Sequence, residues 1–159
     1  MSCDIWIDQT LGSSQFSLYS GTLRVGHKIA ISDTVCRVGF YLKKTGSPTG
    51  TLYARIRKVS DDSIVETSTD TLNVATLTTE FQWCYFNFNA IVDEEVRLLC
   101  EYSNGISNHV LVRVQTTNVI SGNATVYNGS IYTEYANYDI TIKIYTVSVV
   151  GGILSQIIT

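Results

Sequence analysis

Apolar and polar side chains alternate along most of this chain. The segment "TLRVGHKIAI" (22–31) places Leu23, Val25, His27, Ile29 and Ile31 on one side of an extended backbone. The same period of two recurs, in segments rich in β-branched and aromatic residues, at 35–44, 51–59, 81–89, 95–102, 109–116 and 138–150. This pattern predicts a β-strand at each of these segments.

Turn-forming residues separate the predicted strands, as in "SDDS" (60–63) and "YNGS" (127–130). No segment has a convincing period of 3.6 residues, although "NVATLTTE" (73–80) fits one helical turn. Short strands with regular turns are typical of antiparallel sandwiches and jelly rolls. We therefore predict an all-β fold, an antiparallel β-sandwich or jelly roll, as a single domain over residues 1–150.

The loop "TGSPTG" (45–50) contains the only proline, Pro48, between Gly46 and Gly50. Proline fixes φ, and glycine allows backbone angles that other residues avoid. The loop is therefore predicted to be the solvent-exposed tip of a hairpin without a catalytic role.

The segment "FQWCYFNFN" (81–89) is apolar on both faces. Phe81, Trp83 and Tyr85 share one face, whereas Phe86 and Phe88 share the other. In a single sandwich one face of such a strand would meet water, so we expect a subunit interface or an overlying loop to cover it. Trp83 and Tyr85 are accordingly predicted to lie in an assembly interface.

The last residues follow Gly151-Gly152 and carry no charged side chain. Four large aliphatic residues are concentrated there: Ile153, Leu154, Ile157 and Ile158. Exposed apolar segments of this kind promote aggregation unless they are buried. We predict that 151–159 is an arm that docks on a neighbouring subunit by adding a strand to its sheet; the alternative is a tail that folds back onto its own domain.

Composition narrows the class of partner. The chain has 159 residues, 45% hydrophobic and 16% charged, with a formal net charge of −3. An acidic balance disfavours nucleic acid as the partner, because phosphate binding needs a basic face.

No run approaches the ~18 apolar residues of a membrane span, and "SCDIWIDQ" lacks the regions of a signal peptide. The basic group Arg55, Arg57 and Lys58 is interpreted as a solvated strand face.

Four cysteines are present, Cys3, Cys36, Cys84 and Cys100, and each alternates in phase with apolar neighbours. Free cysteine behaves as a small buried hydrophobe. The favoured interpretation is four reduced thiols in the core, and the leading alternative is a Cys84–Cys100 bridge between neighbouring strands.

Catalytic and cofactor chemistry has little support. His27 falls on an apolar face and is predicted to be a core histidine, and no spacing resembles a zinc site. The cysteines are predicted to be buried, which disfavours an activated thiolate. No pair of spaced acids suggests glycoside hydrolysis. We expect no enzyme activity, no catalytic residues and no cofactor.

One calcium site remains as an alternative. Asp93 and Glu94 could supply ligands together with carbonyl groups of "YSNG" (102–105), since calcium prefers several oxygen ligands. The favoured interpretation is a solvated turn before a strand.

The stretch "GFYLKKTGSPTG" (39–50), together with "FQWCYFNFN" and "EEVRLLCEYSNG" (94–105), resembles a recurring jelly-roll module of phage and environmental virus proteins and of bacterial surface proteins of the choice-of-anchor type. The similarity covers roughly Val25 to Val114. It departs at Gly26-His27-Lys28-Ile29, where Gly-Gln-Ser-Phe is common. The resemblance implies a jelly-roll fold and a noncatalytic structural or binding role, and it implies no site residues.

Two functional hypotheses follow. The first is a noncatalytic structural protein of a virus particle, such as a phage capsid, decoration or fibre component. It would be a homo-oligomer, a trimer or larger, in contact with other virion proteins and extracellular after assembly. The second is a carbohydrate-binding or receptor-binding module, in which exposed Trp and Tyr rings stack on surface glycans. Neither requires nucleic acid, a membrane or a metal.

Overall fold

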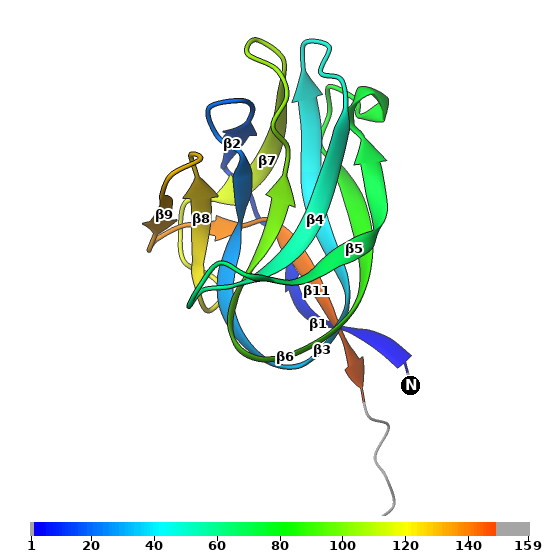
Figure 1. Cartoon of the computed structure of the whole chain (residues 1–159), viewed down its shortest axis with the longest axis vertical. Helices are drawn as coiled ribbons and strands as arrows, with labels where there is room; N and C mark the ends of the chain where they lie inside the picture. The colour runs from blue at the N-terminus through cyan, green and yellow to red at the C-terminus, as the bar shows by residue number, and fades with distance from the viewer. Residues whose placement is uncertain (1, 149–159) are drawn as a thin grey trace, which may run out of the picture.

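The computed structural model describes residues 2–148 of the chain (Figure 1). The described residues form eleven strands, β1 (Ser2–Gln9), β2 (Ser14–Leu18), β3 (Arg24–Thr45), β4 (Thr51–Lys58), β5 (Ile64–Asn73), β6 (Gln82–Glu101), β7 (His109–Gln115), β8 (Asn123–Tyr127), β9 (Tyr132–Tyr135), β10 (Asp139–Ile140) and β11 (Ile142–Ser148). The predicted segments 22–31 and 35–44 join in β3, and 81–89 and 95–102 join in β6, whereas β1, β2, β5, β8 and β9 lie outside the predicted segments. A single 3-10 turn, η1 (Val74–Thr76), occupies the segment where one helical turn was expected. All strand pairs are antiparallel, so the predicted all-β antiparallel sandwich is confirmed.

Two long, bent strands organise the fold. β3 and β6 pair from Arg24↔Glu101 to Leu42↔Gln82, and both curve around the base of the molecule (Figure 1). The first half of β3 and the second half of β6 lie in one layer, where β8 and β9 extend it on one side and β4 and β5 on the other. The opposite halves lie in a second layer with β11 and β1. Each long strand therefore contributes to both layers.

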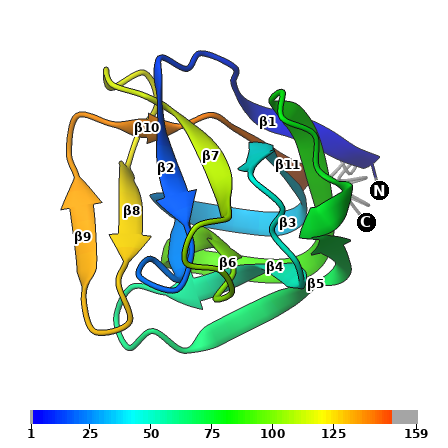
Figure 2. The same cartoon turned by 90° about the horizontal axis from the view of Figure 1, so that it is seen from above.

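The remaining strands complete the second layer. β7 pairs with the end of β3, with β2 and with β10. In the view from above, β8 and β9 lie on one side of the molecule and β1 and β11 on the other (Figure 2). No helix among residues 2–148 has the length and apolar character needed to cross a membrane.

The core fills the space between the layers. The alternation predicted in 22–31 is confirmed, because Val25, His27, Ile29 and Ile31 are all buried. Phe86 of β6 faces Phe40 of β3 edge to face, with ring centroids 6.1 Å apart. Fully burying a side chain of this size contributes about 1.5–3 kcal/mol, so the inward rows of β3 and β6 account for much of the driving force for folding.

The loop at 45–50 differs from its prediction. β4 pairs with β6 and not with β3, so the loop connects the two layers and is not the tip of a hairpin. Pro48 is buried, although Ser47 and Thr49 are exposed. The backbone carbonyl of Thr49 accepts a hydrogen bond from the Tyr102 hydroxyl at 2.9 Å. The sequence indicates the turn correctly, but local residues do not determine which strand pairs next.

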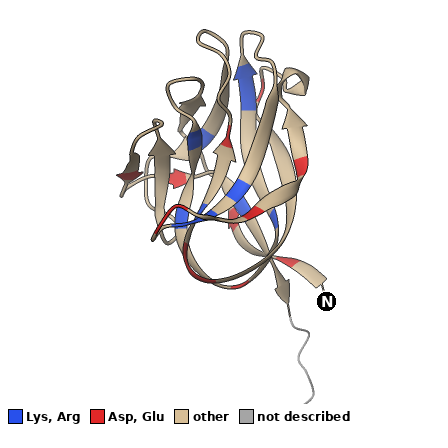
Figure 3. Ribbon diagram, viewed as in Figure 1, with Lys and Arg blue, Asp and Glu red and all other residues tan. Residues whose placement is uncertain are grey.

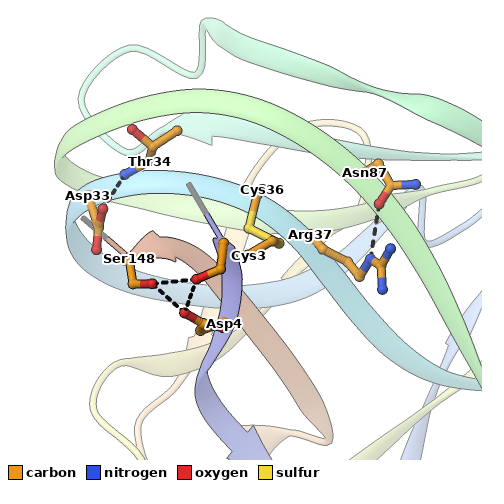
Figure 4. Close-up of a disulfide and its surroundings, with 9 residues drawn as sticks. Cys3, Asp4, Asp33, Thr34, Cys36, Arg37, Asn87 and Ser148 are labelled. Atoms are coloured by element: carbon orange, nitrogen blue, oxygen red, sulfur yellow. Dashed lines mark hydrogen bonds between the residues drawn. A yellow bond between two sulfur atoms is a disulfide. The ribbon is translucent and has the colours of Figure 1, made fainter. Parts of the chain in front are cut away.

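The cysteine prediction is also wrong in part. Cys3 and Cys36 form a disulfide between β1 and β3 (Figure 4). The pairing of β3 with β6 shifts register between Val35 and Arg37, so Val35 is buried while Cys36 is only partly buried. Cys84 and Cys100 are free and buried, which confirms their predicted state and contradicts the alternative bridge.

Candidate binding surfaces

Five aromatic side chains gather on the outer side of the second layer. We call this surface the aromatic face, and its members are Tyr41, Phe81, Trp83, Tyr85 and Tyr145. It forms because odd-numbered residues of β3 and β6 near these positions point away from the core, while Phe40, Leu42, Cys84 and Phe86 point into it. β3 and β6 pair Tyr41 with Trp83 and Gly39 with Tyr85, so the outward side chains of the two strands lie directly beside one another.

The rings form a continuous row. Ring centroids are 5.4 Å apart for Tyr41 and Phe81, 4.9 Å for Tyr41 and Trp83, and 6.3 Å for Trp83 and Tyr85. Tyr85 then meets Tyr145 edge to face at 6.2 Å. These are the distances at which aromatic pairs attract one another beyond simple burial, so the row is ordered before any partner binds.

Gly39 makes room for this row. A Cβ atom at Gly39 would lie 2.8 Å from Cε1 of Tyr85 and 3.4 Å from Cε3 of Trp83. The first distance is shorter than a Cβ contact allows, so any larger residue here would push the Tyr85 ring aside. The absence of a side chain at Gly39 thus lets an aromatic ring cover the middle of the sheet.

Cations flank the rings on both sides. Lys43 Nζ lies 4.7 Å from the centroid of Phe81, and Lys143 Nζ lies 4.7 Å from that of Trp83. The Arg37 guanidinium is 5.9 Å from both Tyr85 and Tyr145. Such contacts contribute about 0.5–1 kcal/mol at exposed sites. The aromatic face therefore presents positive charge around an apolar centre.

Few acidic side chains neutralise the cations of this face. Asp8 lies 3.5 Å from Lys143, with a side chain that is 53% exposed. The Arg37 Nε donates to a neutral group, Asn87 Oδ1, at 3.0 Å (Figure 4). Partial burial raises the pKa of Tyr85, so its hydroxyl remains neutral at physiological pH and adds no negative charge.

The structure brings together the two described residues of the predicted interface. Trp83 and Tyr85 lie side by side in the row, and 41% of Tyr85 is exposed. The other rings of this face, Tyr41, Phe81 and Tyr145, are half-buried, as Trp83 is. Ile153, Leu154, Ile157 and Ile158, the remaining predicted interface residues, lie outside the described part of the chain.

The outer side of the first layer carries charge instead of rings. We call the group Arg24, Arg55, Arg57, Asp62 and Glu101 the ionic cluster. Arg57 Nε donates to Glu101 Oε1 at 2.6 Å, and Arg55 NH1 donates to Glu101 Oε2 at 2.5 Å. Arg24 NH1 donates to Asp62 Oδ2 at 2.7 Å. The predicted solvated face is thus wrong for Arg55 and Arg57, which are bound to a nearly buried carboxylate.

Distant segments assemble this cluster. The Tyr132 hydroxyl of β9 donates to Asp62 Oδ1 at 2.7 Å and accepts from Arg24 NH1 at 2.7 Å. Asp62 sits in the β4–β5 turn at a φ of 60°, a left-handed conformation that Asp tolerates better than most residues. Glu101 falls on the face of the alternating segment 95–102 opposite to Val96, Leu98 and Cys100, so its spacing carries no specific signal for the cluster.

Acidic side chains line the base of the molecule where β3 and β6 bend. We call this group the acidic bend, and its members are Asp33, Asp93, Glu94 and Glu95. Figure 3 shows red along this base, and blue mainly on the sheet faces. Lys58 Nζ forms an ion pair with Glu94 Oε1 at 2.8 Å, and the Ser32 hydroxyl donates a hydrogen bond to Asp93 Oδ1. Apart from the Lys58 contact, no ion pair within residues 2–148 compensates the negative charge of this group.

The calcium alternative is not supported by this arrangement. Asp93 lies at the bend, whereas 102–105 follows the far end of β6, about 30 Å away at ~3.3 Å per residue. Among residues 2–148, no group of three or more His, Cys, Asp or Glu side chains is placed to hold a metal ion.

His27 and Cys84 are buried titratable groups that are held in their neutral forms. His27 is fully buried, and its Nε2 lies 2.8 Å from the Ser121 carbonyl oxygen while Nδ1 has no partner within the described residues. Burial lowers the pKa of His27. Burial also raises the pKa of Cys84 to about 11, so this thiol stays protonated and is a poor nucleophile.

No family model matches this chain, and no curated protein matches it.

Proposed function

We propose that this chain is a noncatalytic structural protein of a virus particle or a comparable extracellular assembly, and that its copies associate through the aromatic face. The observation that carries the proposal is the row of Tyr41, Trp83, Tyr85 and Tyr145 on an outer sheet surface, where Tyr85 is 41% exposed and the other three rings are half-buried. Large aromatic rings and arginine are enriched at protein interfaces, where they bury much area at a low cost in side-chain entropy.

Charge favours a specific contact between copies. The aromatic face carries Arg37, Lys43, Lys143 and Arg113, so two such faces would repel if they met. The acidic bend is a separate surface of the same chain with the opposite sign, and Ile91 beside it is 81% exposed. The face of one copy would therefore receive the bend of the next.

A contact between two different surfaces is heterologous. Such contacts repeat around a ring or along a fibre, depending on whether the rotation closes. The predicted arm of residues 151–159 would add to this contact. The Cys3–Cys36 disulfide supports a protein that works in an oxidising environment.

The carbohydrate-binding alternative uses the same rings. Tyr85 is 41% exposed, and Trp83 beside it is half-buried. With Asn87 as a hydrogen-bonding neighbour, the two rings are suited to stacking on a sugar. A stable monomer that binds neutral sugars, and loses them on Trp83→Ala, would favour this function over assembly.

A charge-exchange experiment tests the proposal. Arg37→Glu/Lys143→Glu and Asp93→Lys/Glu95→Lys should each shift the mass measured by light scattering toward monomer, because each places like charges across the contact. Combining all four substitutions in one chain should restore association. Lys28→Glu, a reversal outside the aromatic face, is the matched control and should change nothing.

Each result decides a separate point. If Arg37→Glu/Lys143→Glu loses association and Asp93→Lys/Glu95→Lys does not, the aromatic face is still the interface but the acidic bend is not its partner. Unchanged mass in both double variants would contradict the proposal. Deleting 151–159 tests the arm independently of both.

A further inference from the structure

A pocket opens where β3 and β4 begin and β6 ends. Its volume is about 240 Å³, and its lining includes Arg24, Thr51, Tyr53, Arg55, Glu101 and Ser103. At ~30 Å³ for each liquid water molecule, it has room for roughly eight waters or one compact ring-bearing molecule. The pocket lies on the layer opposite to the aromatic face.

The charges beside this pocket do not balance. Arg57 holds Glu101 with a two-pronged contact, Nε to Oε1 at 2.6 Å and NH2 to Oε2 at 3.4 Å. Arg24 holds Asp62 at 2.7 Å. Each carboxylate of the ionic cluster thus has its own guanidinium, and Arg55 is a third cation in a cluster with two anions.

The Arg55 guanidinium is held in a position where it can contact a negatively charged ligand. Its Nε donates to Thr67 Oγ1 at 3.1 Å and its NH1 to Glu101, which fixes the plane of the guanidinium. Its NH2 has no partner among the described residues, and 27% of the side chain is exposed. A fixed guanidinium with free donors matches the geometry of a carboxylate.

The other walls favour a ring-shaped ligand. Tyr53 is 38% exposed at the pocket, and the Arg55 guanidinium lies 5.1 Å from its ring centroid. Thr51 and Ser103 are exposed and carry hydroxyl groups. An aromatic surface next to hydroxyls and a cation suits a molecule with an apolar ring face, several hydroxyls and one negative charge.

We propose that this pocket binds a carboxylate-bearing monosaccharide unit, with Arg55 contacting the carboxylate and Tyr53 stacking on the sugar ring. Arg24 adds positive charge, and the single surplus charge of the cluster matches a monoanion better than a phosphate dianion. This site does not depend on how the copies associate.

Calorimetric titration with three small molecules tests the site on the full chain. Glucuronate should bind saturably. Glucose, which has the ring without the carboxylate, should bind at least tenfold more weakly, and so should acetate, which has the carboxylate without the ring. Equal binding of acetate and glucuronate would overturn the assignment to a sugar, and no saturable binding of glucuronate would overturn the site.

Two variants locate the binding. Arg55→Gln should weaken glucuronate binding at least tenfold, whereas Arg37→Gln on the aromatic face, the matched control, should leave it unchanged. Tyr53→Ser should remove the preference for glucuronate over acetate and keeps the test valid if Arg55→Gln fails to fold. Unchanged binding in Tyr53→Ser, or equal losses in Arg55→Gln and Arg37→Gln, would contradict the proposal.

Discussion

The ionic cluster and the aromatic face lie on opposite layers, yet β3 and β6 build both. The first half of β3 supplies Arg24 and the second half of β6 supplies Glu101 to the cluster. The other halves supply Tyr41 and Trp83 to the aromatic face. Two strands that fold over a common core thus present different chemistry at their two ends.

The two surfaces differ in how many of their side chains find partners within the same chain. Each carboxylate of the ionic cluster receives a guanidinium within the same chain, and Glu101 is only 7% exposed. The rings of the aromatic face pack on one another but keep part of their area in water. We infer that the carboxylates of the ionic cluster mainly hold the fold together, with Arg55 left to bind a ligand, and that the aromatic face as a whole is free to bind.

The largest effect that separates the two surfaces is expected at Glu101. Glu101→Gln removes the carboxylate on which Arg24, Arg55 and Arg57 converge and leaves these charges close together in a partly buried site. Breaking a buried ion pair costs about 3–5 kcal/mol. Urea unfolding should show a loss of this size, with no change in association beyond that caused by instability.

Glu94→Gln is the matched control. Glu94 pairs with Lys58, but the two side chains are 36% and 40% exposed. Exposed pairs contribute about 0–1 kcal/mol, so this variant should unfold near the wild-type midpoint. Similar losses in Glu94→Gln and Glu101→Gln would show that the ionic cluster has no special role in stability.

A smaller effect is expected at the disulfide, which fixes β1 beside the aromatic-face layer. Cys3 and Cys36 are 33 residues apart in sequence. Cross-links of this kind stabilise by about 2–4 kcal/mol, largely through the unfolded state. Cys3→Ser/Cys36→Ser should lose that amount, and Ellman titration of the oxidised wild-type protein in denaturant should find two free thiols, those of Cys84 and Cys100. Four thiols would contradict the disulfide.

Acid should weaken the ionic cluster before it affects the aromatic face. Burial raises the pKa of Asp62, but hydrogen bonds from Tyr132 and Arg24 outweigh burial and lower it below its ordinary value of 3.8. The unfolded state then binds protons first, so this stability is present above about pH 4 and is lost as the pH falls below it. The effect should not exceed about 1 kcal/mol, since Asp62 is partly exposed.

Asp62→Asn should flatten this part of the stability curve, and Asn also tolerates the left-handed backbone at this position. His27 contributes a separate loss that begins as the pH falls below 6.5, because burial lowers its pKa; Asp62→Asn should leave that part unchanged. An equally steep acid loss below pH 4 in wild type and variant would show that Asp62 adds no stability.

Local periodicity predicted the inward residues of both layers well, because burial repeats every second residue in a regular strand. It placed Phe86 and Cys84 inside and Trp83 and Tyr85 outside, as found. It failed at Cys36, where the irregularity between Val35 and Arg37 reverses the phase. A bulge is a feature of pairing between strands, so one strand's sequence does not show it.

The two surfaces differed in how far sequence could predict them. Three of the five rings of the aromatic face, Phe81, Trp83 and Tyr85, come from the single segment 81–89, where they are visible as alternating letters. The ionic cluster joins residues as far apart as Arg24 and Tyr132, 108 positions along the chain. Its members are brought together by topology, which the period of a strand does not specify.

If copies associate as proposed, the aromatic face becomes buried in the oligomer. Trp6→Phe leaves Trp83 as the only tryptophan, since the chain has two. Its fluorescence emission and its quenching by acrylamide would be followed as protein concentration rises, with Arg37→Glu/Lys143→Glu in the same background as the control. We predict that emission shifts to shorter wavelength and quenching falls as oligomers form, and that the control shows neither change. Oligomer formation with no change at Trp83 would contradict the account.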